Sequence, residues 1–297
     1  MRVLITGGTG FIGSALVKTL LNRDDRVLIL TRQDRVDQSN CRYIQSLDQI
    51  ENGEAIDAVV NLAGASLAGQ RWSRAYKQEI ISSRLQTTRH LIGLVQRMRQ
   101  RPEVLINASA IGYYGHSLHN TFTEASKPTG ESFSQQLCQD WEAAANEAIA
   151  LGLRVCCLRL GVVMDAEGGA LRDMSQSFRL GLASWLGSGH QWLSWIHRID
   201  AVQAILYLIE RRGLAGAFNI TAPGPVTHRE FCRALKQHHR TVVTAGVPGL
   251  VMRILVGEMA DELLLKGQKV EPQALADAGF HFRYPDINSA LAAIYHN

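Results

Sequence analysis

The sequence predicts an α/β protein built on a doubly wound parallel sheet, with a smaller, mostly helical C-terminal domain. Two observations lead to this fold class. Through the first half of the chain, short apolar runs alternate with longer segments of helical periodicity, and the first run ends in a glycine-rich turn. Buried parallel strands read as continuous apolar runs, and their alternation with helices indicates βαβ units.

The expected sheet is assembled within residues 1–165. Its strand candidates are Arg2–Thr6, Arg26–Thr31, Ala58–Leu62, Val104–Ala108 and Val155–Leu160. The helical segments between them are Ile12–Asn22, Gln78–Gln100 and Phe133–Ala150. Right-handed crossovers are expected to connect the strands.

The second domain, residues 166–297, shows a less regular pattern. We expect a helix at Asp200–Arg211 and a strand at Ala217–Thr221 that can return to the main sheet, so the boundary near Leu160 is not sharp. The tail from residue 246 onward reads as mostly helical, with turns at its prolines.

The composition is that of an ordinary globular protein and excludes several classes. The 31 basic and 27 acidic side chains give a net charge of +4 without a dense basic run, so no nucleic-acid partner is expected. The sequence contains no apolar run of about 18 residues, so no membrane span is expected, and no signal peptide is recognisable. The five cysteines include no Cys-x-x-Cys pair, so neither a metal site nor a disulfide framework is expected, and free thiols fit the cytoplasm.

The glycines Gly7, Gly10 and Gly13 form a Gly-x-x-Gly-x-x-Gly turn between the first strand and the first helix. Glycine allows the tight turn, lets a pyrophosphate approach the backbone, and permits close packing of the helix on the strand. The pyrophosphate then rests on the helix N-terminus, beside Phe11 and Ile12, where N–H groups and the helix dipole favour anions. The turn therefore predicts a Rossmann dinucleotide-binding site.

The end of the second strand discriminates between NAD and NADP. An NAD site usually has an acidic residue there, about 20 residues past the glycines, which binds the ribose 2′-hydroxyl. This chain has Thr31 and Arg32 instead. Arg32 can pair with a 2′-phosphate, and Thr31 can donate a hydrogen bond to it. We therefore predict NADP(H); Asp34 would be the acidic residue if the strand were two residues longer.

The third strand candidate ends at a turn of small residues. Asn61 is followed by Leu62, Ala63 and Gly64, which would let the adenosine side of a dinucleotide lie against the backbone. The alternative is an ordinary strand-to-helix turn.

Together these motifs resemble the extended short-chain dehydrogenase/reductase superfamily, which includes the sugar-nucleotide epimerases. The resemblance covers nearly the whole chain, through Thr6–Gly13, Asn61–Gly64, Asn107–Ala110, Leu158–Gly161 and Trp195–Asp200. A narrower resemblance is to the atypical YfcH-like subgroup, the epimerase family proteins, through segments such as Arg71-Trp72, Gly112-Tyr113-Tyr114 and Asp140-Trp141-Glu142. Residues 246–295 resemble that subgroup's terminal domain of unassigned function. The subgroup implies NADP(H) as the cofactor.

The resemblance adds three cofactor candidates. Arg84 lies on the helix after the Asn61–Gly64 turn and would approach a phosphate. Glu79 would accept a hydrogen bond from a ribose hydroxyl or hold Arg84; the alternative for the two residues is an ordinary ion pair on the helix face. Cys138 stands where the superfamily has a lysine, and its position alone would bring it to the cofactor.

The catalytic pattern of the superfamily is broken. Its members use Tyr-x-x-x-Lys on a helix, in which the lysine lowers the tyrosine pKa and the tyrosine exchanges a proton as hydride moves. Ser109 keeps the accompanying strand-end position, but Ser134 and Cys138 replace the tyrosine and the lysine. Tyr114, in the loop after Ser109, and His197 are candidate replacements, since histidine exchanges protons near neutral pH. The alternative for Tyr114 is a packing residue or a substrate contact, and the alternative for His197 is a hydrogen-bonded structural histidine.

Two functions stay open. The first is an NADP(H)-dependent oxidoreductase or epimerase-like enzyme that acts on a small polar substrate such as a nucleotide sugar. The second is a non-enzymatic NADP(H)-binding redox sensor or regulator, which accounts directly for the lost Tyr-x-x-x-Lys. The sequence predicts no particular oligomeric state or substrate, because a fold does not determine a function.

Overall fold

A computed structural model describes residues 1–296 and contains a central sheet of seven parallel strands. The strand order is β12-β7-β5-β4-β1-β2-β3. The strands are β1 (Arg2–Thr6), β2 (Arg26–Leu30), β3 (Cys41–Ile44), β4 (Ala58–Asn61), β5 (Val104–Ala110), β7 (Arg154–Leu160) and β12 (Gly216–Ile220). The order reverses between β1 and β4, and ligands of doubly wound sheets bind at the carboxyl ends of the strands at such a point.

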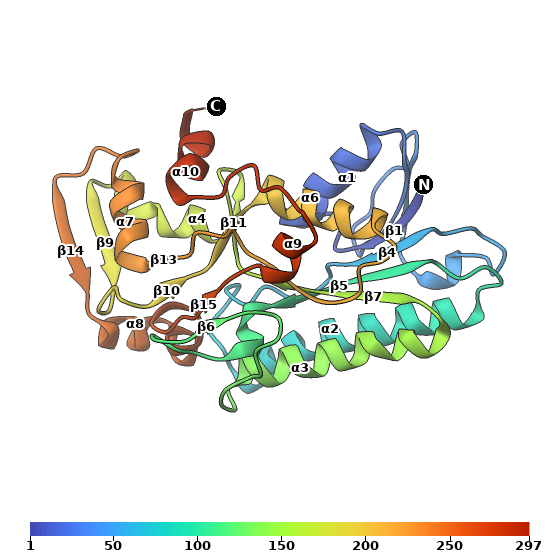
Figure 1. Ribbon diagram of the computed structural model, residues 1–297, viewed down its shortest axis with the longest axis horizontal. Coiled ribbons are helices and arrows are strands. Elements are labelled where there is room, and N and C mark those ends of the chain that lie inside the picture. Colours follow the sequence, from blue (N-terminus) through green and yellow to red (C-terminus); the bar gives the residue numbers. More distant parts are fainter. Residues whose placement is uncertain (297) are drawn as a thin grey trace.

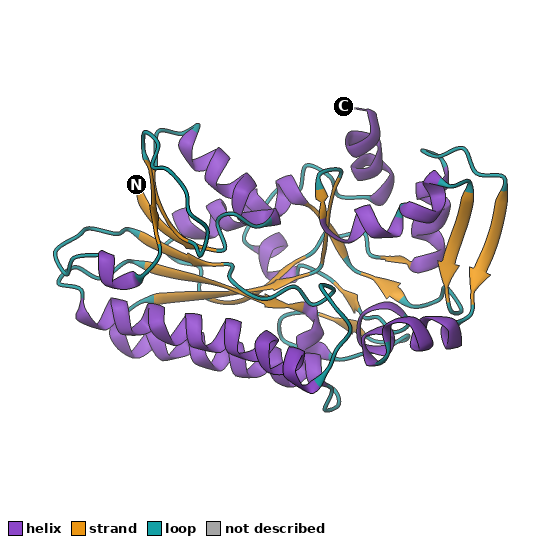
Figure 2. Ribbon diagram, turned by 180° about the vertical axis from the view of Figure 1, so that it is seen from behind, coloured by secondary structure: helices purple, strands orange, loops and turns teal. Residues whose placement is uncertain are grey.

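Helices cover both faces of this sheet (Figures 1 and 2). The helices α1 (Phe11–Leu21) and α6 (Arg198–Glu210) lie on one face, and α2 (Arg74–Arg97) and α3 (Phe133–Asn146) lie on the other. Side chains along each strand alternate between the two resulting cores, so Cys156 packs with α1 and α6 while Cys157 packs with α2 and α3. All five cysteines are buried and unpaired.

A second, smaller part of the protein lies beyond the carboxyl edge of the sheet, on the left of Figure 1. Its strands form two-stranded pairs: β8 (Val162–Asp165) with β11 (Trp195–His197), β9 (Leu182–Leu186) with β14 (Val243–Val247), and β10 (Trp192–Leu193) with β13 (Val226–Thr227). Its helices are α4 (Gly169–Met174), α5 (Gln176–Arg179), α7 (His228–Lys236) and α10 (Ile287–His296). They enclose an apolar core that includes the fully buried rings of Phe178, Trp195 and Phe231.

The C-terminal segment returns from this second part to the main sheet. It contains α8 (Gly249–Val256), a π-helical turn (Ala260–Leu264), β15 (Lys269–Val270) and α9 (Gln273–Asp277). β15 pairs with β6 (Thr121–Phe122), a strand of the loop after β5. The carboxylate of Asp200, on α6, accepts hydrogen bonds from the backbone N–H groups of Arg283 and Tyr284, both at 2.9 Å. These contacts hold the segment across the carboxyl edge of the sheet.

The predicted strands of the first half are present, with ends that differ by one or two residues at most. The strand expected at Ala217–Thr221 is β12, which pairs with β7 in the main sheet. The helix expected from Gln78 begins earlier, because the Ser73 hydroxyl caps it by accepting from the N–H of Tyr76 at 3.1 Å. β3 was not predicted, because Arg42 and Tyr43 interrupt its apolar run.

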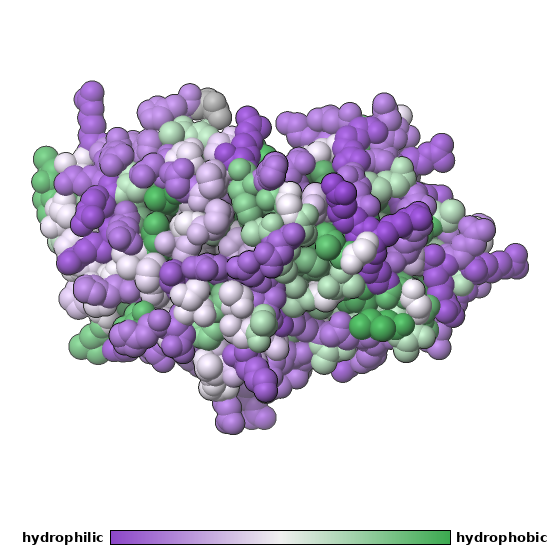
Figure 3. Space-filling model, viewed as in Figure 1, coloured by the Kyte–Doolittle hydropathy of each residue, from purple (hydrophilic) through white to green (hydrophobic). Residues whose placement is uncertain are grey.

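The face of the molecule shown in Figure 3 is largely hydrophilic, with separate apolar patches. One group of exposed apolar side chains belongs to α8 and β14, remote from β1 and β2: Val243, Leu250, Ile254 and Leu255. No helix within residues 1–296 is both long enough and apolar enough to cross a bilayer. In the same range, no three His, Cys, Asp or Glu side chains gather as metal ligands would.

Candidate functional site

A buried row of polar side chains joins the carboxyl ends of three adjacent strands. Thr6, Asn61 and Asn107 are paired in register on β1, β4 and β5. The Thr6 hydroxyl donates to Asn61 Oδ1 at 2.6 Å, and Asn61 Nδ2 donates to Asn107 Oδ1 at 2.6 Å. Asn61 Nδ2 also donates to Thr88 of α2 at 2.9 Å. Because the three strand residues are almost completely buried, these bonds fix the relative positions of the loops that follow the strands.

The glycine turn packs directly against the turn after β4. Gly7 has a φ of +71°, and a Cβ atom there would lie 2.6 Å from the carbonyl oxygen of Leu62. A Cβ atom at Gly13 would clash with the carbonyl oxygen of Gly7. The N–H of Ala63 donates to the Thr6 hydroxyl at 3.2 Å. The two segments that the sequence assigned to the cofactor are therefore adjacent.

The helix α1 begins at the glycine turn without a side-chain cap. Its N-cap is Gly10, so no side chain occupies the N–H groups of the first turn. The Phe11 ring lies beneath the Arg198 guanidinium, 5.1 Å from ring centroid to Cζ, and against the backbone of Gly169. Ile12 is half-buried in the main core. The turn thus presents an anion-binding helix end that the second part of the protein partly covers.

Thr31, Arg32 and Asp34 follow directly after β2, the strand that pairs with β1. Thr31 is buried, and its hydroxyl oxygen accepts from the N–H of Gln33 at 3.1 Å, which leaves the hydroxyl hydrogen to donate. Arg32 is exposed at the strand end. Asp34, the acidic alternative, is exposed and accepts a long hydrogen bond from the Gln45 side chain at 3.4 Å. Arg32 therefore stands nearer the strand end than any carboxylate of this turn.

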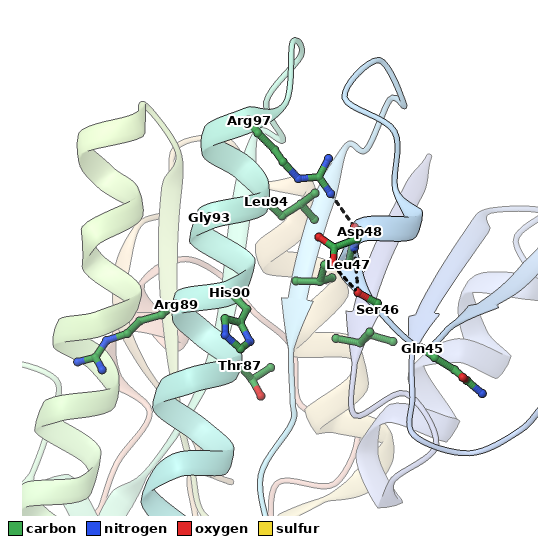
Figure 4. Close-up of a pocket in the computed structure, with 11 residues that line it drawn as sticks. Gln45, Ser46, Leu47, Asp48, Thr87, Arg89, His90, Gly93, Leu94 and Arg97 are labelled. Atoms are coloured by element: carbon green, nitrogen blue, oxygen red, sulfur yellow. Dashed lines mark hydrogen bonds between the residues drawn. The ribbon is translucent and has the colours of Figure 1, made fainter.

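A cavity of about 530 Å³ opens beside this strand end, between β2, the loop after β3 and α2 (Figure 4). Its walls include Leu30, the loop 45–48, and Thr87 and His90 of α2. Arg97 of α2 donates to the carbonyl oxygen of Leu47 at 2.6 Å and so holds the loop. The sequence gives no sign of this cavity, because the loop that lines it follows β3, a strand without a continuous apolar run.

Arg84, on α2, holds the turn after β4 in place through a hydrogen bond to its backbone. Its guanidinium is buried and donates to the carbonyl oxygens of Ala65 and Ile80, both at 3.1 Å. A Cβ atom at Gly64 would lie 2.8 Å from Arg84 Cζ, so only glycine leaves room for the guanidinium. Burial lowers the pKa of Arg84 below its ordinary value. Glu79 is exposed and stands apart from these bonds, so the ion pair considered for the two residues is not formed within residues 1–296.

A buried ionic network lies beneath the loop after β5. Arg159 of β7 donates to both carboxylate oxygens of Glu142 at 2.9 Å, and the Ser109 hydroxyl donates to Glu142 Oε1 at 2.7 Å. Arg159 also donates to the Tyr114 hydroxyl at 2.9 Å, which donates to Asn219 Oδ1 at 2.7 Å. Burial raises the pKa of Tyr114 to about 12. Because Tyr114 is fully buried and saturated with partners, its geometry indicates a supporting role rather than the predicted acid–base role.

His197 caps a helix. Its Nδ1 accepts a hydrogen bond from the N–H of Ile199 at 3.1 Å at the start of α6, and its ring lies 4.2 Å from the ring of Tyr284, centroid to centroid. Burial lowers the pKa of His197. This geometry favours the structural alternative for His197 over proton exchange with a substrate.

Cys138 and Ser134 occupy the helix positions of the missing lysine and tyrosine. Both face the loop after β5, where a Cβ atom at Gly112 would lie 3.3 Å from Ser134 Cβ and 3.8 Å from Cys138 Sγ. Burial raises the pKa of Cys138 to about 11, so the thiol is protonated at neutral pH and does not supply the charge of a lysine. Ser134 is buried as well.

Comparisons with known proteins agree with this architecture. Residues 3–221 match the NAD dependent epimerase/dehydratase family, and residues 247–294 match a domain of unknown function, DUF1731. Epimerase family protein SSP1921 of Staphylococcus saprophyticus is 42% identical, over 99% of each chain. The crystal structure of human epimerase family protein SDR39U1 with NADPH superposes with a TM-score of 0.91, at 32% identity over 100% of both chains.

A nucleoside-diphosphate sugar epimerase from Corynebacterium glutamicum superposes with a TM-score of 0.79, at 29% identity. The match covers 99% of this chain and 58% of that one. The family match over most of the chain, together with the close bacterial relative, decides the assignment. This chain belongs to the NAD dependent epimerase/dehydratase family.

Proposed function

We propose that this protein binds NADP(H) and uses it in an oxidoreductase or epimerase-like reaction on a small polar substrate such as a nucleotide sugar. The observation that carries the proposal is the uncapped start of α1 at the glycine turn, with Arg32 exposed at the end of the neighbouring strand. The human relative solved with NADPH has the same fold along its whole length and supports this choice of cofactor.

The residues present fit the cofactor. Gly7, Gly10 and Gly13, with the backbone of Phe11 and Ile12, would hold the pyrophosphate at the helix N-terminus. Arg32 and Thr31 would bind the 2′-phosphate, beside the cavity at the carboxyl ends of β2 and β3. Leu62, Ala63 and Gly64 would line the adenosine side, with Arg84 holding that turn in place. When bound, the nicotinamide would supply hydride chemistry at a substrate carbon.

The remaining assignments follow from this site. Residues 1–165, completed by β12, would form the cofactor domain, and residues 166–297 would form the opposite wall of the substrate cleft. Glu79, exposed near the start of α2, would accept a hydrogen bond from a ribose hydroxyl of the cofactor. Cys138 would lie beside the cofactor because of its place on α3, without supplying a charge. Five unpaired thiols fit the reducing cytoplasm as the compartment.

A second candidate function is a non-enzymatic NADP(H)-binding sensor. The observation that favours it is the replacement of the family's tyrosine and lysine by Ser134 and a protonated Cys138. Turnover separates the two functions, because a sensor binds NADPH and transfers hydride to no substrate.

The cofactor assignment is tested by replacing Arg32 with alanine. NADPH binding, followed by its fluorescence, is expected to weaken at least about tenfold, which corresponds to about 1.4 kcal/mol, while NADH binding stays within about twofold. Arg35→Ala is the matched control, because Arg35 lies on the same turn but donates to Gln33 at 2.8 Å and 3.1 Å. Equal losses for NADPH and NADH in the Arg32 variant would contradict the 2′-phosphate assignment.

A further inference from the structure

Glu262 links two polar residues near the N-terminus of α3, at the carboxyl end of β5: it contacts Ser134 and acts electrostatically on His116. His116 follows the 3-10 turn Ile111–Tyr114 after β5, Ser134 lies in the first turn of α3, and Glu262 comes from the π-helical turn of the C-terminal segment. Glu262 Oε2 accepts from the N–H of Ser134 at 3.3 Å. A carboxylate of the C-terminal segment therefore lies at the positive end of the α3 dipole.

This place contains polar atoms that lack partners. The Ser134 hydroxyl is shielded from solvent and has no hydrogen bond within residues 1–296, and both ring nitrogens of His116 are shielded as well, with the Gln268 side chain as a neighbouring polar group. Ser134 as a whole is only 7% exposed. A buried polar group without a partner costs about 1–3 kcal/mol, so a bound molecule that supplied a partner to the Ser134 hydroxyl and to the His116 ring would be stabilised here.

The C-terminal segment is held tightly against this site. The N–H of Ser117 donates to the carbonyl oxygen of Gly267 at 3.1 Å, and the Ser194 hydroxyl donates to that of Gln268 at 2.9 Å. These two bonds connect the C-terminal segment to the loop of His116 and to the second part of the protein. Glu262 thus has a defined position relative to His116.

The charged groups that face His116 all come from this segment. They are the carboxylates of Glu262 and Asp261 and the ammonium group of Lys266, and the uncharged Gln268 side chain of the same segment lies within hydrogen-bonding reach of the ring. Burial lowers the pKa of His116, and Lys266 lowers it as well, whereas the two carboxylates oppose the shift. Glu262 is therefore the group that most favours the protonated ring among these charges.

The site also lies where the reactive half of the cofactor would end. The adenosine half would occupy the β2 and β3 side of the reversal in strand order, so the nicotinamide half would extend over β4 and β5. Ser134 is one helical turn before Cys138, and both face Gly112 just after β5. A substrate beside the nicotinamide would reach the His116 ring and the Ser134 hydroxyl.

We propose that His116 is the proton-exchanging group of this protein, that Ser134 binds the same substrate oxygen, and that Glu262 positions the His116 ring. The proposal rests on the proposed NADP(H)-dependent function. In the direction of reduction, a carbonyl carbon takes a hydride with its two electrons from NADPH. The C=O π electrons form the new O–H bond with a proton from the imidazolium, which is left neutral, and oxidation runs the same step backwards. The C-terminal domain would thereby complete the catalytic site.

The test compares His116→Asn and Glu262→Gln with the intact protein, using NADPH and a panel of hydroxylated aldehydes, ketones and keto-sugar nucleotides. The intact protein is expected to reduce at least one member. His116→Asn should lower kcat by about 10²–10⁴-fold while NADPH binding stays within about twofold. Glu262→Gln should shift the fall of kcat with rising pH toward lower pH, because the variant loses a carboxylate that raises the pKa of His116. His119→Asn, an exposed histidine three residues along the same loop, is the matched control and should behave like the intact protein.

The outcomes separate this proposal from the proposed cofactor. A His116→Asn variant with undiminished kcat would overturn the proposal, as would an intact protein that binds NADPH but reduces no member of the panel. Failure of the intact protein to bind NADPH would overturn the proposed cofactor instead. If His116→Asn does not fold, as judged by its Tm, the pH profile of Glu262→Gln decides, and an unshifted profile would overturn the positioning role of Glu262.

Discussion

Replacing Arg159 by methionine is expected to destabilise the protein strongly, because the carboxylate of Glu142 would stay buried without a countercharge. Arg159 donates two hydrogen bonds to Glu142 and one to the Tyr114 hydroxyl, all at 2.9 Å. The two charged residues are 5% and 7% exposed, so water does not replace the lost partner. Removing one member of a buried pair costs about 3–5 kcal/mol.

This cost sets the size of the expected shift. In proteins of about 150–250 residues, each kcal/mol lowers Tm by about 2–4 °C, so the Arg159→Met variant should melt on the order of 10 °C lower. Replacing the pair together, as Glu142→Leu with Arg159→Met, removes both charges. The double variant should recover much of the loss, because an apolar replacement of a buried ion pair is often close to neutral.

Urea unfolding followed by tryptophan fluorescence measures these differences. The matched control is Arg212→Met, which removes an ion pair with Glu103 whose side chains are 80% and 56% exposed, and which should change the free energy of unfolding by less than about 0.5 kcal/mol. An Arg159→Met variant as stable as this control, or a double variant less stable than the single one, would show that the buried charge of Glu142 does not depend on Arg159.

Three further changes have defined outcomes. Gly13→Ala should weaken NADPH binding more than about tenfold by fluorescence titration, because its Cβ would clash with the carbonyl oxygen of Gly7; Gly53→Ala, which meets nothing within 4 Å, should bind normally. Asn61→Leu should lower the free energy of unfolding by about 2–4 kcal/mol in urea, since Thr6 and Asn107 lose their buried partner; an unchanged value would show that the strand ends need no polar link. Burial lowers the pKa of His228 to about 4 from its ordinary value of 6.5. As pH falls, the unfolded protein therefore binds a proton at this histidine before the folded protein does, and stability is lost between pH 6.5 and pH 4. His228→Gln should therefore lose about 2 kcal/mol less than the intact protein between pH 7 and pH 5 in urea, and parallel losses would contradict this origin.

The main sheet was predictable because its signals are local. Each of its first-half strands except β3 is a continuous apolar run next to a periodic helix, and such runs are read from neighbouring residues alone. The strands of the second part are two to five residues long and pair with distant segments, as β9 does with β14. A pairing between distant segments leaves no local sequence pattern, so these pairs appear only in the structure.

The same difference between local and distant signals applies to the candidate site. The glycine turn and Arg32 carry their chemistry in consecutive residues, so the sequence was enough to find them. The roles of Tyr114 and His197 depend on partners elsewhere: Asn219 lies 105 residues beyond Tyr114 and saturates its hydroxyl. Ser134 and Glu262 are 128 residues apart in the chain, so no local sequence pattern predicts their contact. Packing therefore decides which polar groups are structural and which are left for a ligand.

If the glycine turn and Arg32 together hold NADP(H), the unmodified protein must bind NADPH more tightly than NADH. Isothermal calorimetry on the full chain measures both affinities. The 2′-phosphate site predicts a Kd for NADPH at least about tenfold lower than that for NADH, a difference of about 1.4 kcal/mol. Equal affinities, or tighter binding of NADH, would contradict it.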